Sequence, residues 1–216
     1  MFKVNEVTET IHGEMPYPGL PCLLVRFSGC DIKCPYCDTD HSKFGEWTKE
    51  KVLKVISETK LQSVLITGGE PFMQEELVTL LREIPKDKKV VLETNGNIEI
   101  PNEDIFAFGN VTIVMDVKLF ESLKYFNSLN LIRLSSGDIV KFVFWDRESF
   151  DLAVEFLTNN SKLTPWGIKW VFSPTTELIK KGATKAFAAE VVEVQKQFRH
   201  QEIYFQTQLH KIFGVK

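Results

Sequence analysis

Three of the four cysteines lie within one short stretch, Cys30-Asp31-Ile32-Lys33-Cys34-Pro35-Tyr36-Cys37. The spacing C-x3-C-x2-C lets a single loop direct three thiolates toward a common centre. A 4Fe–4S cube ordinarily takes one cysteine for each iron, so three cysteines leave one iron open to a small molecule. We therefore expect Cys30, Cys34 and Cys37 to bind a 4Fe–4S cluster whose fourth iron takes a non-protein ligand.

Two other uses of these cysteines compete with the cluster. A structural zinc ion needs four ligands, usually from two paired motifs, and here the fourth would have to be Cys22 or His41. A disulfide pair is disfavoured because the spacing is tight and residues Met1–Glu6 do not resemble a secretion signal. Cys22 follows the apolar pattern of its own stretch, and we interpret it as a small buried apolar group.

Length and composition limit the classes of protein to be considered. A chain of 216 residues can bury a substantial core, and we expect one domain over residues 1–216. The net charge of −3 leaves no basic stripe, so we expect no nucleic-acid partner. The apolar runs are too short to cross a bilayer, which predicts no membrane association. Reduced thiols placed for a metal cluster fit the cytoplasm, where we expect the protein to reside.

Apolar strand-like runs alternate with amphipathic, helix-like segments along most of the chain. Strands are predicted at 4–10, 21–28, 63–67, 89–93, 111–115, 139–144, 168–172 and 202–206. Helices are predicted at about 47–59, 74–84, 147–158 and 177–198, with Thr48 as an N-cap and Gly182 as a break in the last one. The alternation predicts an α/β fold: a partial, open (β/α) barrel of about six strands, TIM-like but short of the eight units of a closed barrel. A flat, doubly wound sheet is the alternative.

Polar clusters follow the ends of the predicted strands. They lie at 30–39, 67–70, 93–95, 116–118 and 173. The carboxyl ends of parallel strands share one face of a barrel, and that face carries the active site. We therefore expect these separate clusters to converge on one site.

The cysteine loop resembles the signature of the radical S-adenosylmethionine enzymes, and Thr67-Gly68-Gly69-Glu70-Pro71 resembles a second motif of that family. The resemblance implies a radical core in which the open iron chelates the amino and carboxylate groups of S-adenosylmethionine. An electron from the cluster then releases a 5′-deoxyadenosyl radical. The cofactor-binding positions that the resemblance implies are Tyr36, Cys37, Asp38, Gly68, Gly69, Glu70, Thr94, Asn95, Lys118, Ser173 and Pro174. For Asn95 and Ser173 a role in turns is the alternative, and for Lys118 a solvated cation.

Further features resemble the 7-carboxy-7-deazaguanine synthase family of queuosine biosynthesis. They are His12-Gly13-Glu14, Arg26 shortly before Cys30, Asp38-Thr39 after the cysteine loop, and the segment Gln208-Leu209-His210-Lys211. The resemblance covers most of the chain, and about residues 119–165 carry no family-specific motif.

This second resemblance implies a set of substrate contacts. Arg26 would pair with a substrate carboxylate, with an internal salt bridge as the alternative. Glu14 and the backbone of Ile11 to Gly13 would bind the pterin ring, since a carboxylate can accept two N–H bonds from an aminopyrimidinone. The substrate-binding positions are Ile11, His12, Gly13, Glu14, Arg26, Thr67, His210 and Lys216, and the catalytic side chains would be Glu14, Arg26, Glu93 and His210. A surface histidine is the alternative for His210.

The implied reaction is a radical ring contraction. It converts 6-carboxy-5,6,7,8-tetrahydropterin to 7-carboxy-7-deazaguanine with loss of ammonia, and Mg²⁺ on the substrate carboxylate would orient the substrate. Thr39 would be the protein ligand of Mg²⁺, an ion that prefers oxygen and keeps few protein ligands. The family also implies a homodimer, and a flavodoxin or ferredoxin as electron donor.

Two departures from the family pattern keep other hypotheses open. His12 stands where the family usually carries Gln, and Asp116-Val117-Lys118 is nearer to the motif of glycyl-radical-enzyme activases. An activase acting on a partner protein is therefore an alternative function. A non-catalytic module stabilised by a metal is the alternative from a different class.

Overall fold

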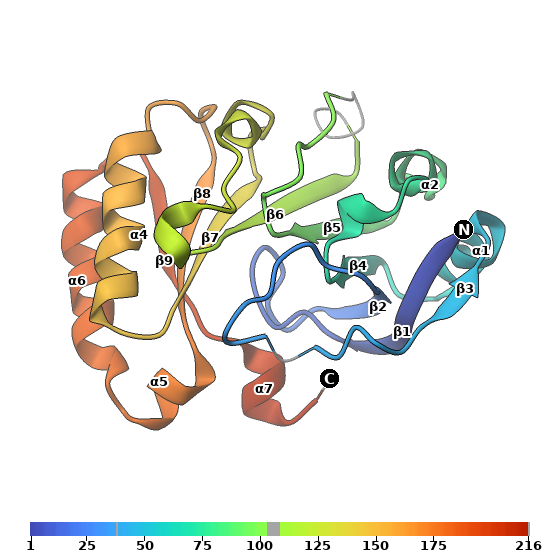
Figure 1. Ribbon diagram of the computed structural model, residues 1–216, viewed down its shortest axis with the longest axis horizontal. Coiled ribbons are helices and arrows are strands. Elements are labelled where there is room, and N and C mark those ends of the chain that lie inside the picture. The colour runs from blue at the N-terminus through green and yellow to red at the C-terminus, as the bar shows by residue number, and fades with distance from the viewer. Residues whose placement is uncertain (38, 103–108, 216) are drawn as a thin grey trace.

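The structure is a computed structural model, and it describes residues 1–37, 39–102 and 109–215. Within these residues nine strands form one sheet, in the order β3-β1-β2-β4-β5-β6-β7-β8-β9. β1 (Phe2–Ile11) lies antiparallel to β2 (Pro21–Phe27) and to the short β3 (Gly45–Trp47). From β2 onward every neighbour is parallel (Figure 1). These strands are β4 (Ser63–Gly68), β5 (Lys89–Thr94), β6 (Val111–Val117), β7 (Ile139–Phe144), β8 (Lys169–Pro174) and β9 (Glu202–Phe205).

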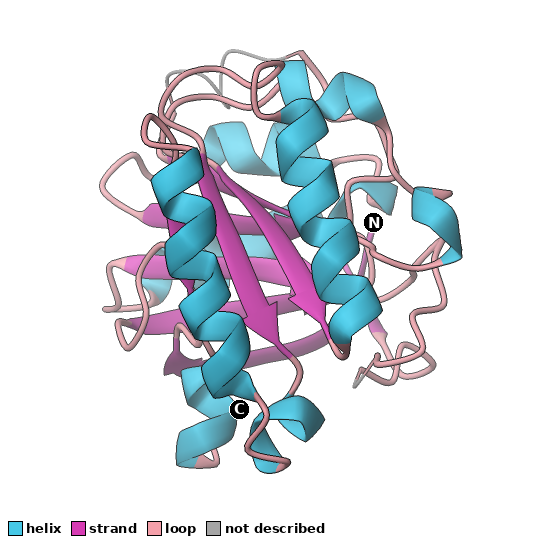
Figure 2. Ribbon diagram, turned by 90° about the vertical axis from the view of Figure 1, so that its left-hand side faces the viewer, coloured by secondary structure: helices cyan, strands magenta, loops and turns pink. Residues whose placement is uncertain are grey.

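Helices connect the parallel strands and cover the outer face of the sheet. The two longest, α4 (Arg147–Asn160) and α6 (Thr184–Gln197), lie side by side over the last strands (Figure 2). The others are α1 (Lys49–Glu58), α2 (Leu77–Glu83), α5 (Thr176–Lys180) and α7 (Leu209–Phe213), with 3₁₀ turns η1 (Pro71–Met73), η2 (Glu121–Leu123) and η3 (Ser128–Ile132). Among the described residues, no helix combines the length and the apolar character needed to cross a membrane.

The strand order decides between the two predicted architectures. A doubly wound sheet reverses its strand order at a switch point, whereas here each parallel strand is added next to the one before it. The sheet stays open, with β3 and β9 at its edges. The predicted partial, open (β/α) barrel is therefore confirmed. Its parallel part has seven strands, each at a predicted position, against the figure of about six given for the barrel, and the three-residue β3 was not predicted.

Two local predictions about the helices are also confirmed. The Thr48 hydroxyl accepts a hydrogen bond from the Lys51 backbone N–H at 3.2 Å and so caps α1. Gly182 has a φ of +69°, a left-handed conformation that favours glycine, and it separates α5 from α6. The long helix expected at 177–198 is thus two helices.

Side chains on the strands alternate between two cores. Outward residues pack with the helices in the large core, and inward ones form a small cluster inside the barrel. On six strands the inward apolar residue is followed two positions later by a polar one. These pairs are Leu24 and Arg26, Leu65 and Thr67, Val91 and Glu93, Val114 and Asp116, Ile139 and Lys141, and Val171 and Ser173. The barrel interior therefore changes from apolar to polar toward the carboxyl ends of its strands.

The turn between β1 and β2 closes the opposite end of the barrel. The backbone N–H of His12 donates to Leu20 O, and that of Gly19 donates to His12 O. Met15 and Tyr17 pack against the inner apolar cluster. The His12 ring is buried, and its Nε2 lies 2.7 Å from the hydroxyl of Ser63 at the start of β4. That hydroxyl donates to Lys89 O, so His12 Nε2 carries the proton and donates to it.

Burial of His12 predicts a pH dependence of stability. Burial lowers the pKa of His12 to about 4, so the folded protein keeps a neutral ring where the unfolded chain would be protonated. Between pH 6.5 and 4 the unfolded state binds more protons than the folded state. The free energy of unfolding should therefore fall by about 2 to 3 kcal/mol as the pH is lowered from 6.5 to 4. The His12→Gln variant should flatten this slope of the unfolding free energy in urea titrations at each pH. The matched variant His200→Gln, at an exposed position, should keep it; an unchanged slope in His12→Gln would contradict the assignment.

Candidate active site

A cavity of about 310 Å³ opens at the carboxyl ends of the parallel strands. It brings together segments from residue 10 to residue 211, including four of the five predicted strand-end clusters. The predicted site residues that line it are Ile11, His12, Gly13, Glu14, Arg26, Cys30, Cys34, Tyr36, Cys37, Thr39, Thr67, Gly68, Gly69, Glu93, Thr94, Asn95, Lys118 and His210. Glu70, Ser173 and Pro174 are not part of the lining, and Asp38 and Lys216 lie outside the described residues.

The three clustered cysteines all face this cavity as free thiols. Among the described residues, no three His, Cys, Asp or Glu side chains are arranged to hold one shared metal ion. A 4Fe–4S cube does not need such an arrangement, because each cysteine binds a different iron. The donor set therefore fits a cube. The remaining cysteine, Cys22, is buried in the barrel, and burial followed by the charge of Glu93 raises its pKa to about 12. It stays protonated and unreactive, as expected.

The glycines after β4 hold the entry to the cysteine loop. The Gly69 N–H donates to Phe27 O at 3.1 Å, and the Glu70 N–H donates to Gly29 O at 2.8 Å. A Cβ on Gly69 would collide with the carbonyl oxygen of Gly29 and would lie 2.7 Å from Cys30 Cβ. The chain's own cysteine loop thus occupies the space next to Gly69.

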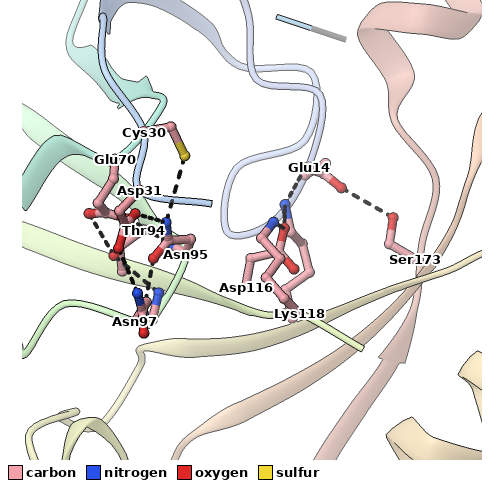
Figure 3. Close-up of polar contacts among 12 residues, drawn as sticks. Glu14, Cys30, Asp31, Glu70, Thr94, Asn95, Asn97, Asp116, Lys118 and Ser173 are labelled. Atoms are coloured by element: carbon pink, nitrogen blue, oxygen red, sulfur yellow. Dashed lines mark hydrogen bonds and ion pairs between the residues drawn. The ribbon is translucent and has the colours of Figure 1, made fainter. Parts of the chain in front are cut away.

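Glu70 lies behind the cavity wall. It is fully buried, and its carboxylate accepts from the Thr94 hydroxyl at 2.9 Å, the Asn95 N–H at 2.7 Å and the Phe72 N–H at 2.9 Å (Figure 3). Burial raises its pKa to about 7 in spite of these bonds. In this arrangement Glu70 fixes the turn that follows β5 and places Thr94 and Asn95 at the cavity.

Asn95 joins that turn to the cysteine loop. Its Nδ2 donates to Asp31 Oδ1 at 2.8 Å and lies 3.9 Å from Cys30 Sγ, while Asn97 donates to the other oxygen of Asp31 at 2.6 Å (Figure 3). The loop is thus tied at one end to the glycines and beside Cys30 to the turn after β5. The Asn95 Nδ2–H group could therefore donate a hydrogen bond to a thiolate at Cys30.

A buried group of charges occupies the other side of the cavity. Glu14 accepts from Lys141 Nζ at 2.9 Å, from Ser173 Oγ at 3.2 Å and from Gln206 Nε2 at 3.3 Å. Asp116 Oδ2 accepts from Lys118 Nζ at 2.9 Å and lies 3.7 Å from Lys141 Nζ (Figure 3). Burial alone would raise the pKa of Glu14, but Lys141 and Ser173 hold it below its ordinary value. Burial opposes the charge of Lys141, yet Glu14 and Asp116 raise its pKa well above the ordinary range. Both partners are therefore charged near neutral pH.

Arg26 and His210 reach the cavity from opposite ends of the chain. Arg26 Nε donates weakly to Glu6 at 3.5 Å, so a salt bridge, the alternative stated for it, coexists with a place at the cavity. His210 belongs to α7, which is joined to the β1–β2 turn by a bond of 2.9 Å from the Leu209 N–H to Gly13 O. A Cβ on Gly13 would overlap the His210 ring, so glycine at this position lets the helix close over the turn.

Lys141 and Gln206 were not expected at the site. Both contact Glu14 directly. Lys141 had a detectable signal, because the two-residue period places it on the same face as Ile139, in a strand whose neighbours are apolar, where a buried cation must find a partner. Gln206 had none, since its contact with Glu14 depends on how the chain continues after β9.

Three polar atoms without a partner in the described part of the chain make the cavity lining suitable for a polar ligand. The hydroxyl of Tyr36, Oδ1 of Asp116 and the hydroxyl of Thr175 are buried without a partner among the described residues, and all three side chains line the cavity. Burial, reinforced by Asp116, raises the pKa of Tyr36, so its phenol remains a hydrogen-bond donor. Buried polar groups are normally satisfied. A polar cofactor or substrate would satisfy these.

Comparisons with known proteins define the class and then the family. The family model of the radical SAM superfamily matches residues 24–124, which include the three cysteines and the glycine motif. The open barrel, the three-cysteine site and the match to this family model together define a radical S-adenosylmethionine enzyme. Enzymes of this class use a 4Fe–4S cluster and S-adenosylmethionine. The chain is also 36% identical, over 177 aligned positions, to the 7-carboxy-7-deazaguanine synthase of Thermoplasma acidophilum, covering 79% of this chain and 81% of that one. This chain belongs to the 7-carboxy-7-deazaguanine synthase family.

Two further comparisons agree with this assignment. The 7-carboxy-7-deazaguanine synthase of Clostridium acetobutylicum is 31% identical over 226 aligned positions, covering 98% of this chain and 95% of the relative. The crystal structure of QueE from Escherichia coli matches the fold with a TM-score of 0.71 at 21% identity, covering 95% of this chain and 94% of that one. The family inferred from the motifs is confirmed, and the alternative of a non-catalytic module is wrong.

The close approach at Gly69 predicts the effect of one methyl group. Gly69→Ala should push Gly29 and Cys30 away and lose most of the bound iron, while far-UV circular dichroism shows an intact barrel. The control Gly45→Ala, whose Cβ would meet only the Trp47 side chain at 3.3 Å or beyond, should keep its iron. Full iron content in anaerobically purified Gly69→Ala would show that this contact does not position the cluster ligands.

Proposed function

We propose that this chain converts 6-carboxy-5,6,7,8-tetrahydropterin to 7-carboxy-7-deazaguanine and ammonia. The observation that carries the proposal is the composition of the cavity at the carboxyl ends of the strands: three cysteines share it with Arg26, Glu14 and Glu93. This combines a site for radical generation with cationic and anionic groups that could orient a small carboxylated heterocycle. When bound at Cys30, Cys34 and Cys37, the cluster together with S-adenosylmethionine would supply the radical chemistry needed to remove hydrogen from C6 of the substrate.

Cofactor binding is assigned to the side of the cavity that holds the cysteine loop. Thr94 and Asn95 lie beside that loop, and Tyr36 packs against Phe120 and Trp145. Lys118 Nζ lies 5.7 Å from the centre of the Tyr36 ring, and a cation there suits a methionine carboxylate. Ser173, which donates to Glu14, and Pro174 would support the site from outside the lining. The proposed cofactor set retains Gly68, Gly69 and Glu70, the last acting through Thr94 and Asn95.

Substrate binding is assigned to the polar ring and the residues that close it. The Arg26 guanidinium would take the carboxylate at C6, for which its two terminal nitrogens suit a bidentate pairing. Glu14, held in its charged form, would accept N–H groups of the aminopyrimidinone, with Thr67 and Glu93 beside the ring. His210, at the start of α7, would cover the bound substrate and limit the access of water to it. Exclusion of water protects a reactive intermediate from side reactions.

The remaining proposals concern the metal ion and the partners. Thr39 lines the cavity next to Cys37, and its hydroxyl would bind Mg²⁺ together with substrate oxygens. We further propose residues 1–216 as one domain that works as a cytoplasmic homodimer and receives electrons from a flavodoxin or ferredoxin. The activase alternative is not retained, because the relatives named above are called synthases.

A product assay tests the proposed reaction. Reduced, reconstituted protein incubated with the tetrahydropterin acid, S-adenosylmethionine and Mg²⁺ should form the deazapurine, seen by chromatography and mass spectrometry. Cys34→Ala should abolish product, whereas Cys22→Ala, outside the cavity, should retain it. Release of 5′-deoxyadenosine without any deazapurine would count against the synthase activity.

Removal of one hydroxyl tests the magnesium site. Thr39→Val should raise the Mg²⁺ concentration needed for half-maximal activity about tenfold or more, the effect typical of losing support at a metal site. Thr158→Val is the control, because its hydroxyl donates to Val154 O on the outer helix α4. Equal Mg²⁺ titrations of Thr39→Val and the unaltered protein would exclude Thr39 as a ligand.

A further inference from the structure

Lys141 is a buried cation in the wall of the active-site cavity. It lies in the middle of β7, where its neighbours Val140 and Phe142 pack outward. Only 6% of its surface is exposed, yet the side chain lines the cavity. Burial of an ammonium group is costly unless it is paired and hydrogen-bonded. The groups that Lys141 already contacts therefore determine which further hydrogen bonds it can donate.

The contacts within the described residues leave Lys141 with donor capacity. Its Nζ donates to Glu14 Oε2 at 2.9 Å and forms a longer ion pair with Asp116 Oδ2 at 3.7 Å. An ammonium group has three N–H donors and no acceptor. At least one donor thus remains for a molecule in the cavity, and it lies next to a carboxylate oxygen that accepts.

This donor and acceptor pair matches one edge of the proposed substrate, and the inference therefore rests on the proposed function. In a 2-amino-4-oxopteridine the ring N–H and the carbonyl oxygen at C4 are adjacent. Glu14 would accept from the amino group and the ring N–H. We propose that Lys141 donates a hydrogen bond to the C4 carbonyl oxygen of the bound pteridine and so selects a 4-oxo ring over a 4-amino ring.

The register of the sheet supports this orientation of the ring. Lys141 on β7 is paired with Asp116 on β6, whereas Arg26 on β2 is paired with Thr67 on β4. β5 lies between these two pairs of strands. The C6 carboxylate and the aminopyrimidinone are at opposite ends of a pteridine. A ring that places its carboxylate at Arg26 would therefore direct its aminopyrimidinone, which carries the C4 oxygen, toward the strands that bear Lys141.

A comparison of two ligands tests the proposal without turnover. The ligands are 2-amino-4-oxopteridine-6-carboxylate and 2,4-diaminopteridine-6-carboxylate, which are aromatic and carry no hydrogen at C6. Titration calorimetry with the holoenzyme and S-adenosylmethionine should show the 4-oxo ligand binding about tenfold more tightly or better, the effect of a charge-assisted hydrogen bond. In Lys141→Met this ratio should fall several-fold, mainly through loss of 4-oxo affinity; it should stay above one, because the 4-amino ring also lacks the ring N–H that Glu14 would accept.

Lys88→Met is the matched control. Lys88 is also a buried lysine, but its Nζ donates at 2.7 Å to Thr59 O and Leu61 O, away from this cavity. It should keep the ligand ratio of the unaltered protein.

Two outcomes would overturn the inference. The first is equal binding of the two ligands by the unaltered protein, which needs no folded variant. The second is an unchanged ratio in Lys141→Met; if both ligands then bind more weakly, Lys141 would be assigned to holding Glu14 only. In each case product formation by the unaltered protein would leave the synthase activity standing, whereas absence of product together with absence of pteridine binding would overturn both.

Discussion

The active site depends on the register of the parallel sheet. On each of six strands an inward polar residue follows an inward apolar one, and each neighbouring strand is fixed by its backbone pairing. Successive side chains point to opposite faces, so a slip of one residue would turn Arg26, Glu93 or Lys141 outward into the helix-covered core. The large outer core opposes such a slip, because the outward-facing residues that alternate with the inward ones on these strands are buried and apolar. Packing outside the barrel thus fixes the chemistry inside it.

The cysteine loop depends on a second constraint, the approach of two backbones. Bonds from Gly69 and Glu70 to Phe27 and Gly29 hold the start of the loop, and the lack of a side chain at Gly69 permits that distance. The adjoining Glu70 extends the same arrangement by binding the turn after β5, from which Asn95 reaches Asp31. One short motif therefore places the loop and its neighbouring turn relative to each other. Internal contacts therefore explain why this motif carries a glycine at position 69 and a glutamate at position 70.

The sequence predicted those parts of the site that are marked by local chemistry. Cysteine spacing, glycines after a strand and polar residues at strand ends are all visible without a structure, and the open barrel follows from the alternation of elements. Lys141 was not predicted because it lies in the middle of β7 and not at a strand end, although the two-residue period places it on the inward face. Two features could not be predicted because they depend on tertiary packing. They are the closure of the amino-terminal end of the barrel by the β1–β2 turn and the contact of Gln206 with Glu14. For Glu70 the sequence predicted a place at the site but not its position behind the cavity lining, because residue type alone does not show whether a carboxylate faces the cavity.

The pair of Glu14 and Lys141 is best explained by function. Desolvation of two charges can exceed their mutual attraction, and well-packed apolar residues at such positions are often equally or more stable. Here Ser173 and Gln206 supply further donors to Glu14, and Asp116 gives Lys141 a second anion, so the cost of burial is shared among several contacts. This arrangement keeps both groups charged and in place before a ligand arrives. Groups fixed in advance need little reorganisation during the reaction, and that gain can outweigh the stability that an apolar pair would provide.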